Sequence, residues 1–261
     1  MTISQISEGP VRALSVRLAN SDADIAAAQA LRWQVFCQEH GAIVDGAAGC
    51  LDADPFDAVC DHLLVEDSGT GATVVVGTYR LLRESVARRH SGFYSAGEYH
   101  LDGLSAFPEP DSELLELGRS CVAPAYRDAG TIQLLWRGIA SYLELHRISL
   151  MFGCASFHGT DPSDHADTLS YLYHNHLAPP HLRASALPER HVEMARLPIG
   201  GYDARQAMRK LPPLIKGYLR VGAMVGDGAV IDAPFNTVDV FMVMPVSAIS
   251  ARYLGRFGAA A

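Results

Sequence analysis

One stretch near the middle of the chain combines a carboxylate, guanidinium groups and a turn that opens a helix. Residues 113–140 read ELLELGRSCVAPAYRDAGTIQLLWRGIA. The first part predicts a strand that carries Glu116 and Arg119, and the turn around Arg127 leads into an amphipathic helix. The start of a helix offers unpaired backbone N–H groups and the positive end of the helix dipole, which both favour a bound anion. The stretch therefore predicts a phosphate site next to a strand that bears a candidate acid–base residue.

Four residues of this turn are candidates for holding the anion: Arg127, Gly130, Thr131 and Ile132. Gly130 permits a close backbone approach because it has no Cβ. The pattern R-x-x-G-x-I has low specificity by itself, so an ordinary strand-to-helix turn is the alternative interpretation. Its position between a strand with polar residues and a long helix favours the anion site.

Glu116 and Arg119 are three positions apart, so in a regular strand their side chains point to opposite faces. Either one of the two is structural, or a β-bulge turns one of them toward the other. A salt bridge that ties the strand to a helix is a further interpretation of the pair. The sequence leaves these alternatives open.

The elements around this stretch predict an α/β fold with a mixed twisted sheet and helices on both of its faces. Residues 42–60 form an acidic loop that is long enough to suggest a functional lid. The expected strands are 14–19, 62–66, 73–82, 114–122, 149–157, 228–232 and 237–243, and the expected helices are 22–41, 131–147, 161–176 and 214–224.

The composition is that of a folded, acidic protein. The chain has 261 residues, 49% of them hydrophobic, and a formal net charge of -8, which excludes a disordered chain and a basic nucleic-acid binder. We expect a single domain over 1–261, with 1–10 flexible and a helix and two strands in 200–261 completing the sheet. No apolar run reaches the roughly 18 residues that a membrane span needs. Five cysteines without a CxxC pair indicate reduced thiols in a cytoplasm, and we expect no metal site.

Several motifs resemble known acyltransferases. The strand, R-x-x-G-x-I turn and helix resemble the pyrophosphate-binding element of the GNAT acyltransferase superfamily. LRWQVF, CDHLLV, GTYRLLR and ELGR resemble the acyl-homoserine-lactone autoinducer synthases. ELGRSCV, FGCASFHGTDP, LPPLIKGYLR, GDGAVID and FNTVDVF resemble the ornithine N-alpha-acyltransferases, and the matching segments cover roughly residues 30 to 245. The chain is thus similar to ornithine N-alpha-acyltransferases over nearly its whole length, with a GNAT-like fold implied.

The resemblance implies how the acyl donor is held. In this superfamily the turn grips the phosphopantetheine arm of the donor, here that of acyl carrier protein, and we expect no permanently bound cofactor. Backbone N–H groups from Ser120 to Val122 are expected to stabilise the oxyanion. A tyrosine often protonates the departing thiolate, and we take Tyr171 for this role, with Tyr173 as the alternative.

The resemblance also implies an acceptor, L-ornithine, whose alpha-amine attacks the thioester to give a lyso-ornithine lipid. Glu116 is the expected base for this amine, and Arg119 the second catalytic residue. Arg32 and Arg80 match positions that hold or shape the acceptor site in the related synthases, and a guanidinium suits a carboxylate. The side-chain ammonium of ornithine is expected on the acidic loop. The candidates there are Asp45, Asp52, Asp54, Asp57 and Asp61, of which Asp61 is our choice.

An acyl carrier protein is acidic, so it must meet this acidic chain through a local basic patch. Residues 83–90 (Arg83, Arg88, Arg89, His90) and residues 205–220 (Arg205, Arg209, Lys210, Lys216, Arg220) are the two candidates. The lipid product suggests transient contact with the inner-membrane surface. Two alternatives remain at this point: an autoinducer-type synthase that uses an S-adenosyl substrate, and a non-catalytic module that binds an acyl carrier or a lipid.

Overall fold

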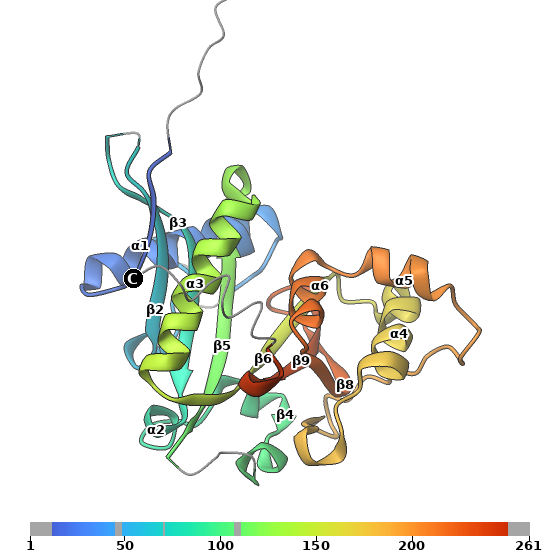
Figure 1. Cartoon of the computed structure of the whole chain (residues 1–261). Coiled ribbons are helices and arrows are strands. Elements are labelled where there is room, and N and C mark those ends of the chain that lie inside the picture. Colours follow the sequence, from blue (N-terminus) through green and yellow to red (C-terminus); the bar gives the residue numbers. More distant parts are fainter. Residues whose placement is uncertain (1–11, 45–48, 70, 107–110, 250–261) are drawn as a thin grey trace, which may run out of the picture.

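The computed structural model describes residues 12–44, 49–69, 71–106 and 111–249. The expectation that 1–10 are flexible, and the end of the segment 200–261, lie outside these ranges. Within them, nine strands form one sheet in the order β1-β2-β3-β5-β6-β9-β8-β7-β4 (Figure 1). The strands are β1 (Leu14–Leu18), β2 (Asp61–Asp67), β3 (Val74–Arg83), β4 (Tyr99–His100), β5 (Glu113–Val122), β6 (Ile148–His158), β7 (Ser185–Ala186), β8 (Met224–Asp232) and β9 (Thr237–Pro245).

The sheet is mixed. β5 pairs with β6 in parallel, and β7 pairs with β8 in parallel, whereas the other named pairs are antiparallel. β9 pairs over its whole length with residues 150–158 of β6, and β8 pairs with β9, so the two last strands extend the sheet beyond β6. The predicted α/β fold class is confirmed, since a mixed sheet carries helices on both faces.

Helices lie on both faces of the sheet, with α3 on one face and α1 on the other (Figure 1). α3 packs on one face through Leu135 and Ile139, which join Leu63 and Val65 of β2 in the main core. α1 packs on the other face, where Leu31 contacts the cluster around Cys121 of β5. The helices are α1 (Asp22–Trp33), α2 (Glu84–Ala87), α3 (Ala129–Leu145), α4 (Ala166–His176), α5 (Ala204–Lys210) and α6 (Pro213–Arg220).

Local sequence explains most helix ends. Ser21 accepts a hydrogen bond from the backbone N–H of Asp24 at the start of α1, and Asp128 does the same for Thr131 at the start of α3. The helix predicted over 22–41 continues beyond α1 as a π-helix over Gln34–Glu39. The helix predicted over 214–224 was too long. Gly222, with φ of +98°, follows α6 and turns the chain into β8.

Short elements were missed. α2, α5, β4 and β7, which have two to seven residues, were not predicted, because none of them carries a clear apolar periodicity. Over the described ranges, none of the helices combines the length and the apolar character that crossing a bilayer requires.

Candidate active site

The parallel pairing of β5 with β6 stops in the middle of both strands. Their last partners are Glu116 and Phe152, although β5 continues to Val122 and β6 to His158. Directly after this point, Gly153 lies so close to β5 that a Cβ on it would overlap the carbonyl oxygen of Leu117. Beyond Gly153 the two strands separate, and their facing backbone edges lack partners in this ladder.

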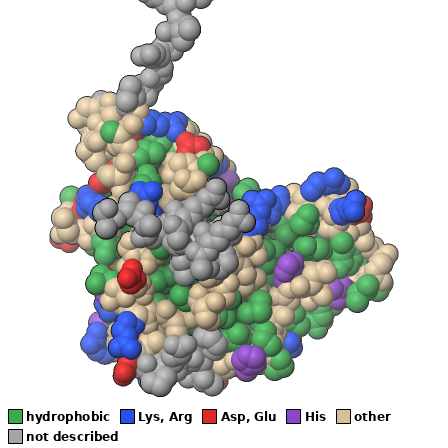
Figure 2. Space-filling view, viewed as in Figure 1, with side chains coloured by type: hydrophobic (Ala, Val, Ile, Leu, Met, Phe, Trp, Pro, Cys, Tyr) green, Lys and Arg blue, Asp and Glu red, His purple; other side chains and the backbone are tan. Residues whose placement is uncertain are grey.

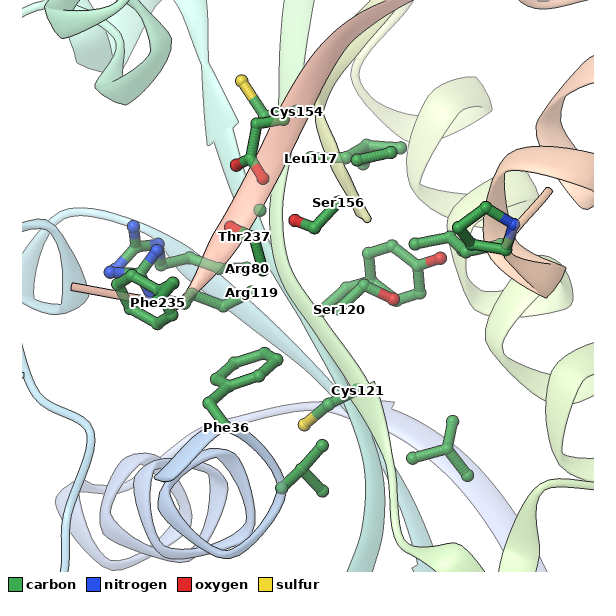
Figure 3. Close-up of a pocket in the computed structure, with 18 of the residues that line it drawn as sticks. Phe36, Arg80, Leu117, Arg119, Ser120, Cys121, Cys154, Ser156, Phe235 and Thr237 are labelled. Carbon is green, nitrogen blue, oxygen red and sulfur yellow. The ribbon is translucent and has the colours of Figure 1, made fainter. Parts of the chain in front are cut away.

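A cavity of about 570 Å³ occupies the region where the strands separate. Residues on both faces of the sheet line it, because the sheet is open there: Phe36 from the α1 side, and Leu135 and Trp136 from α3. Figure 3 shows Leu117, Ser120 and Cys121 of β5 along the cavity, with Cys154 and Ser156 of β6 near them. Ser120 and Val122, predicted from the sequence, both line it.

A β-bulge answers the question of where Arg119 points. The register between β3 and β5 shifts between the pairs Thr78–Cys121 and Arg80–Gly118, and Arg119 has a φ of +49°. As a result Arg119 lies on the same side as Arg80 and Glu116, and all three line the cavity. Of the alternatives that the sequence left open, the structure shows the β-bulge, which turns Arg119 to the same side as Glu116.

The guanidinium of Arg119 is held between two rings and two carboxylates. It lies 4.9 Å from the ring centre of Tyr94 and 4.3 Å from that of Phe235, and Figure 3 shows Arg80 and Arg119 beside Phe235. It forms ion pairs of 3.3 Å with Asp52 and 3.2 Å with Asp54. Its Nε makes no hydrogen bond with any described residue.

Glu116 is buried, and its carboxylate is oriented by the short helix that follows Phe93. Oε2 accepts from the backbone N–H of Tyr94 at 2.8 Å, and Oε1 accepts from the backbone N–H and the hydroxyl of Ser95 at 2.7 and 2.5 Å. Burial raises the pKa of Glu116, and the hydrogen bonds from Ser95 and Tyr94 only partly oppose this. A carboxylate with a raised pKa at the cavity wall suits proton transfer.

The acidic loop is fastened to the sheet by three arginines. Buried Arg32 of α1 bonds to Asp52 at 2.9 Å and to Asp57 at 2.9 and 2.7 Å. Arg80 of β3 bonds to both oxygens of Asp54 at 2.7 Å. Asp52, Asp54 and Asp57 are thus occupied by guanidinium groups, which leaves them poor candidates for an ammonium. Arg32 is not among the described residues that line the cavity, whereas Arg80 is.

Two other predicted site residues lie away from the cavity lining as the structure describes it. Asp61 accepts a hydrogen bond of 2.6 Å from Tyr142 on the α3 side of the sheet and lies 3.8 Å from Arg83. Tyr171 is on α4, where its hydroxyl is 3.3 Å from Nε2 of His176. Asp45 lies outside the described residues. The structure therefore does not bring Asp61 or Tyr171 to the cavity.

The turn before α3 reaches the cavity with two of the predicted residues, Arg127 and Ile132. Arg127 is paired with both carboxylate oxygens of Glu39 at 2.6 Å. The side chain of Asp128 caps the helix through the N–H of Thr131, and it lies beside Gly130. The predicted anion site is thus filled by the chain's own carboxylates, and a phosphate must compete with Glu39 and Asp128 there.

Sequence reasoning missed two carboxylates of the cavity, Asp232 of β8 and Asp239 of β9. Asp239 is 7% exposed, and its Oδ1 has no hydrogen-bond partner among the described residues. A signal was present, because Asp239 interrupts the apolar strand Thr237–Pro245 with a charge. No cluster of metal-ligating side chains occurs in the part of the chain that the structure describes.

In this open mixed sheet a turn and the long helix α3 connect two central parallel strands, β5 and β6, which separate over a cavity, and this is the arrangement of the GNAT acyltransferase fold. A family model described as an acetyltransferase (GNAT) domain matches residues 31–137. Among solved structures, FeeM, an N-acyl amino acid synthase from uncultured soil microbes, is 10% identical, with a TM-score of 0.52 over 93% of this chain and 98% of that one. The acyl-homoserine lactone synthase BjaI is 12% identical, with a TM-score of 0.52 over 95% and 92% of the two chains. At these identities the solved structures support the fold alone.

Relatives with higher sequence identity show to which family of GNAT acyltransferases the chain belongs. The L-ornithine N(alpha)-acyltransferase of Brucella abortus is 49% identical over 258 residues, which are 97% of this chain and 92% of that protein. That of Rhodobacter capsulatus is 40% identical over 91% of this chain and 92% of that protein. The chain belongs to the family of L-ornithine N(alpha)-acyltransferases, and the family predicted from the sequence is confirmed. This membership makes the chain an N-acyltransferase and disfavours both alternatives, the autoinducer synthase and the non-catalytic module.

Proposed function

We propose that the protein transfers a (3-hydroxy)acyl group from acyl carrier protein to the alpha-amine of L-ornithine, forming a lyso-ornithine lipid. The observation that carries this proposal is the cavity between β5 and β6, which is open to both faces of the sheet. A donor that enters from one face can present its thioester to an amine that is seated on the other. Family membership supplies the identity of the acceptor.

The donor is expected along the free edge of β5. Beyond Glu116 this edge has no ladder with β6, so its backbone groups are available to the pantetheine amides and to the thioester carbonyl. Ser120, Cys121 and Val122 line the cavity, and their backbone N–H groups are expected to stabilise the oxyanion. The phosphate of the phosphopantetheine is expected near Arg127, which lines the cavity together with His40 and His158. To bind the phosphate, the guanidinium of Arg127 would leave its ion pair with Glu39.

The acceptor is expected on the polar side of the cavity. The carboxylate of the amino acid is expected beside Arg119, which lines the cavity and whose guanidinium it would share with Asp52 and Asp54. Glu116 takes a proton from the alpha-ammonium, directly or through one water. The amine nitrogen then attacks the thioester carbon and gives up its second proton, the C–S bond breaks, and the pantetheine thiolate takes up a proton as it leaves, so that an amide and a thiol are formed. Tyr79 lines the cavity and bonds to Tyr218 at 3.1 Å, so it is better placed than Tyr171 to give that proton.

The carrier protein is expected to dock on α5 and α6. Figure 2 shows Lys and Arg side chains gathered over these helices, and α6 also provides cavity residues such as Leu214. Of the five basic residues there, Lys210 is the one that forms an ion pair with a described residue, Asp167. In the rival patch Arg88 pairs with Glu84, and Arg83 with Asp61 and Glu113. The α5–α6 patch therefore keeps more positive charge for an acidic partner.

Reconstitution tests the proposal. Purified protein is incubated with 3-hydroxyacyl carrier protein and radiolabelled ornithine, and the lipid fraction is counted and identified by mass. We expect an N-acyl-ornithine whose formation depends on both substrates. Labelling from S-adenosylmethionine in place of ornithine, or binding of the acyl carrier protein without turnover, would contradict the proposal.

A further inference from the structure

One end of the cavity carries negative charge that the protein itself does not neutralise. Of the described residues that line the cavity, three bear carboxylates: Glu116, Asp232 and Asp239. The oxygens of Glu116 are occupied by Tyr94 and Ser95. Asp232 and Asp239 form no ion pair within 4.0 Å across the described ranges.

Strand pairing places the two aspartates on one face. Asp239 of β9 lies opposite Ser156 of β6, and Asp232 of β8 lies opposite Thr237, two positions from Asp239. Directly opposed residues and alternate residues of a strand share a face, so both carboxylates point to the same side of the sheet. Figure 3 shows Ser156 and Thr237 side by side in this part of the cavity.

A buried carboxylate without a counter-charge is costly, and Asp239 is 93% buried with Oδ1 unpartnered among described residues. A ligand that brings its own cation would remove this cost. The acceptor proposed above carries such a group, an ammonium three methylenes away from the carbon that bears its reacting amine. β6 lies between β9 and the gap where the thioester is expected, and neighbouring strands are about 5 Å apart. An extended three-carbon side chain that passes over β6 reaches toward the carboxylate of Asp239.

We propose that Asp239, with Asp232 beside it, forms the subsite that receives the side-chain ammonium of the acceptor amino acid. The assignment rests on the proposed function and adds the residues that select a diamino acid. It also replaces the acidic loop, because Asp52, Asp54 and Asp57 are already paired with arginines.

The surroundings of Asp239 predict how binding depends on pH. The charged and titratable groups that face it are Asp232 from β8, Glu98 before β4, Tyr99 of β4, Cys154 from β6 and Arg119 from β5. Burial raises the pKa of Asp239 to about 6, and Asp232 adds to this, although hydrogen bonds from Thr237 and Ser156 and the charge of Arg119 oppose it. The carboxylate form binds a cation, so ornithine affinity rises as the pH increases through about 6 and then levels off.

Acceptor selectivity tests the subsite. Ornithine is compared with 2-aminopentanoate, which has the same three-carbon side chain and no terminal amine. For Asp239→Asn we expect kcat/KM for ornithine to fall about 10- to 100-fold, as for a lost hydrogen bond to a charged group, while 2-aminopentanoate is used as before. Asp164→Asn, the same change on an exposed residue outside the cavity lining, should alter neither value. An unchanged ratio of the two acceptors, or an equal loss on both, would overturn the assignment.

Two further measurements separate this inference from the proposed function. Asp232 is less buried than Asp239, so Asp232→Asn provides a second variant, with an expected loss of ornithine preference of about 3- to 10-fold. Stabilisation of the donor-free protein by ornithine, followed as a rise in Tm, should vanish in Asp239→Asn. If the wild-type protein acylates neither acceptor, the proposed function fails, whereas an Asp239-dependent rise in Tm would still uphold the subsite. If ornithine still raises the Tm of both variants as much as that of the wild type, the proposed subsite is refuted.

Discussion

Glu116 and Phe152 are the last partners of the parallel ladder between β5 and β6, and the cavity begins where their pairing ends. The separation depends on Gly153, whose backbone lies against the carbonyl of Leu117. The catalytic carboxylate that we propose is thus positioned at the apex of the opening, next to the carbon that a thioester would present.

The close contact between Gly153 and Leu117 predicts that adding one methyl group at position 153 lowers the stability of the protein strongly. In Gly153→Ala the new Cβ would overlap Leu117, so β5 and β6 must shift, at a cost of about 3 kcal/mol or more of unfolding free energy. Urea unfolding measures this loss. Gly97→Ala is the matched control, because nothing lies within 4 Å of a Cβ there, and its change should stay below about 1 kcal/mol. Equal stabilities of the two variants would mean that the close approach does not exist.

Removing the proposed base should affect turnover more than binding. We expect Glu116→Gln to lower kcat about 100- to 10,000-fold, since positioned proton transfer contributes in this range. The amide also meets the N–H donors of Tyr94 and Ser95 with one NH2 group, so some stability is lost. Donor binding, followed by titration with acyl carrier protein, distinguishes the two effects. A variant that keeps its kcat would show that Glu116 only anchors the segment at Tyr94.

The buried pair of Arg32 and Asp57 predicts acid sensitivity. Burial by itself would raise the pKa of Asp57, but ion pairs with Arg32 and Arg80 outweigh it and hold that pKa well below its usual range. A lowered folded-state pKa stabilises the protein above the unfolded pKa of about 4, and this contribution is lost as the pH falls through the folded value.

Arg32→Gln is therefore expected to cost about 3–5 kcal/mol at pH 7, because it strands buried carboxylates, and less at pH 3.5. Arg12→Gln makes the same substitution in the exposed pair with Asp128 and should cost about 1 kcal/mol or less. Denaturant unfolding at both pH values checks this. A cost for Arg32→Gln that does not depend on pH would contradict the assignment to ion pairing.

Reversing one charge on α6 should weaken the binding of acyl carrier protein and leave the use of a small acyl donor unchanged. For Lys216→Glu we expect KM for acyl carrier protein to rise about 10-fold at low salt, with the effect reduced at high salt by screening. Turnover of acyl-pantetheine should not change, because that donor has no acidic surface. Arg89→Glu in the other basic patch serves as the control. If Arg89→Glu raises KM and Lys216→Glu does not, the docking surface is the patch around α2.

The raised pKa of Asp239 predicts a stabilising substitution. A folded-state pKa of about 6, above the unfolded value near 4, means that the folded protein binds more protons than the unfolded chain between these values. The ligand-free protein therefore loses on the order of 2–3 kcal/mol as the pH rises from 4 to 6. Asp239→Asn removes this loss, so its Tm should exceed that of the wild type at pH 8. A lower Tm of the variant at pH 8 would show that the carboxylate is already compensated.

The local sequence was sufficient for much of the fold. Strand and helix positions follow from apolar periodicity and capping residues, which are local properties, and the motifs that predicted the family lie on those elements. Glu116, Arg119, Arg127 and Ile132 were singled out in this way and line the cavity, whereas Gly130 and Thr131 of the same turn are not in the described lining. Arg32 and Arg80 were singled out by resemblance, and Asp61 for its charge on the acidic loop; Arg80 lines the cavity, whereas Arg32 and Asp61 lie outside the described lining.

By itself, the sequence determined that an α/β acyltransferase sheet forms and which strand carries the reactive side chains. Only the tertiary structure decided which charged side chains of the site pair with one another and which are left without a partner. A bulge against β3 turns Arg119 toward Glu116, arginines from α1, β3 and β5 pair with the loop aspartates, and Oδ1 of Asp239 on β9 is left without a hydrogen-bond partner among the described residues. Register and charge pairing depend on residues that are distant in the chain, and periodicity along one segment contains no information about them.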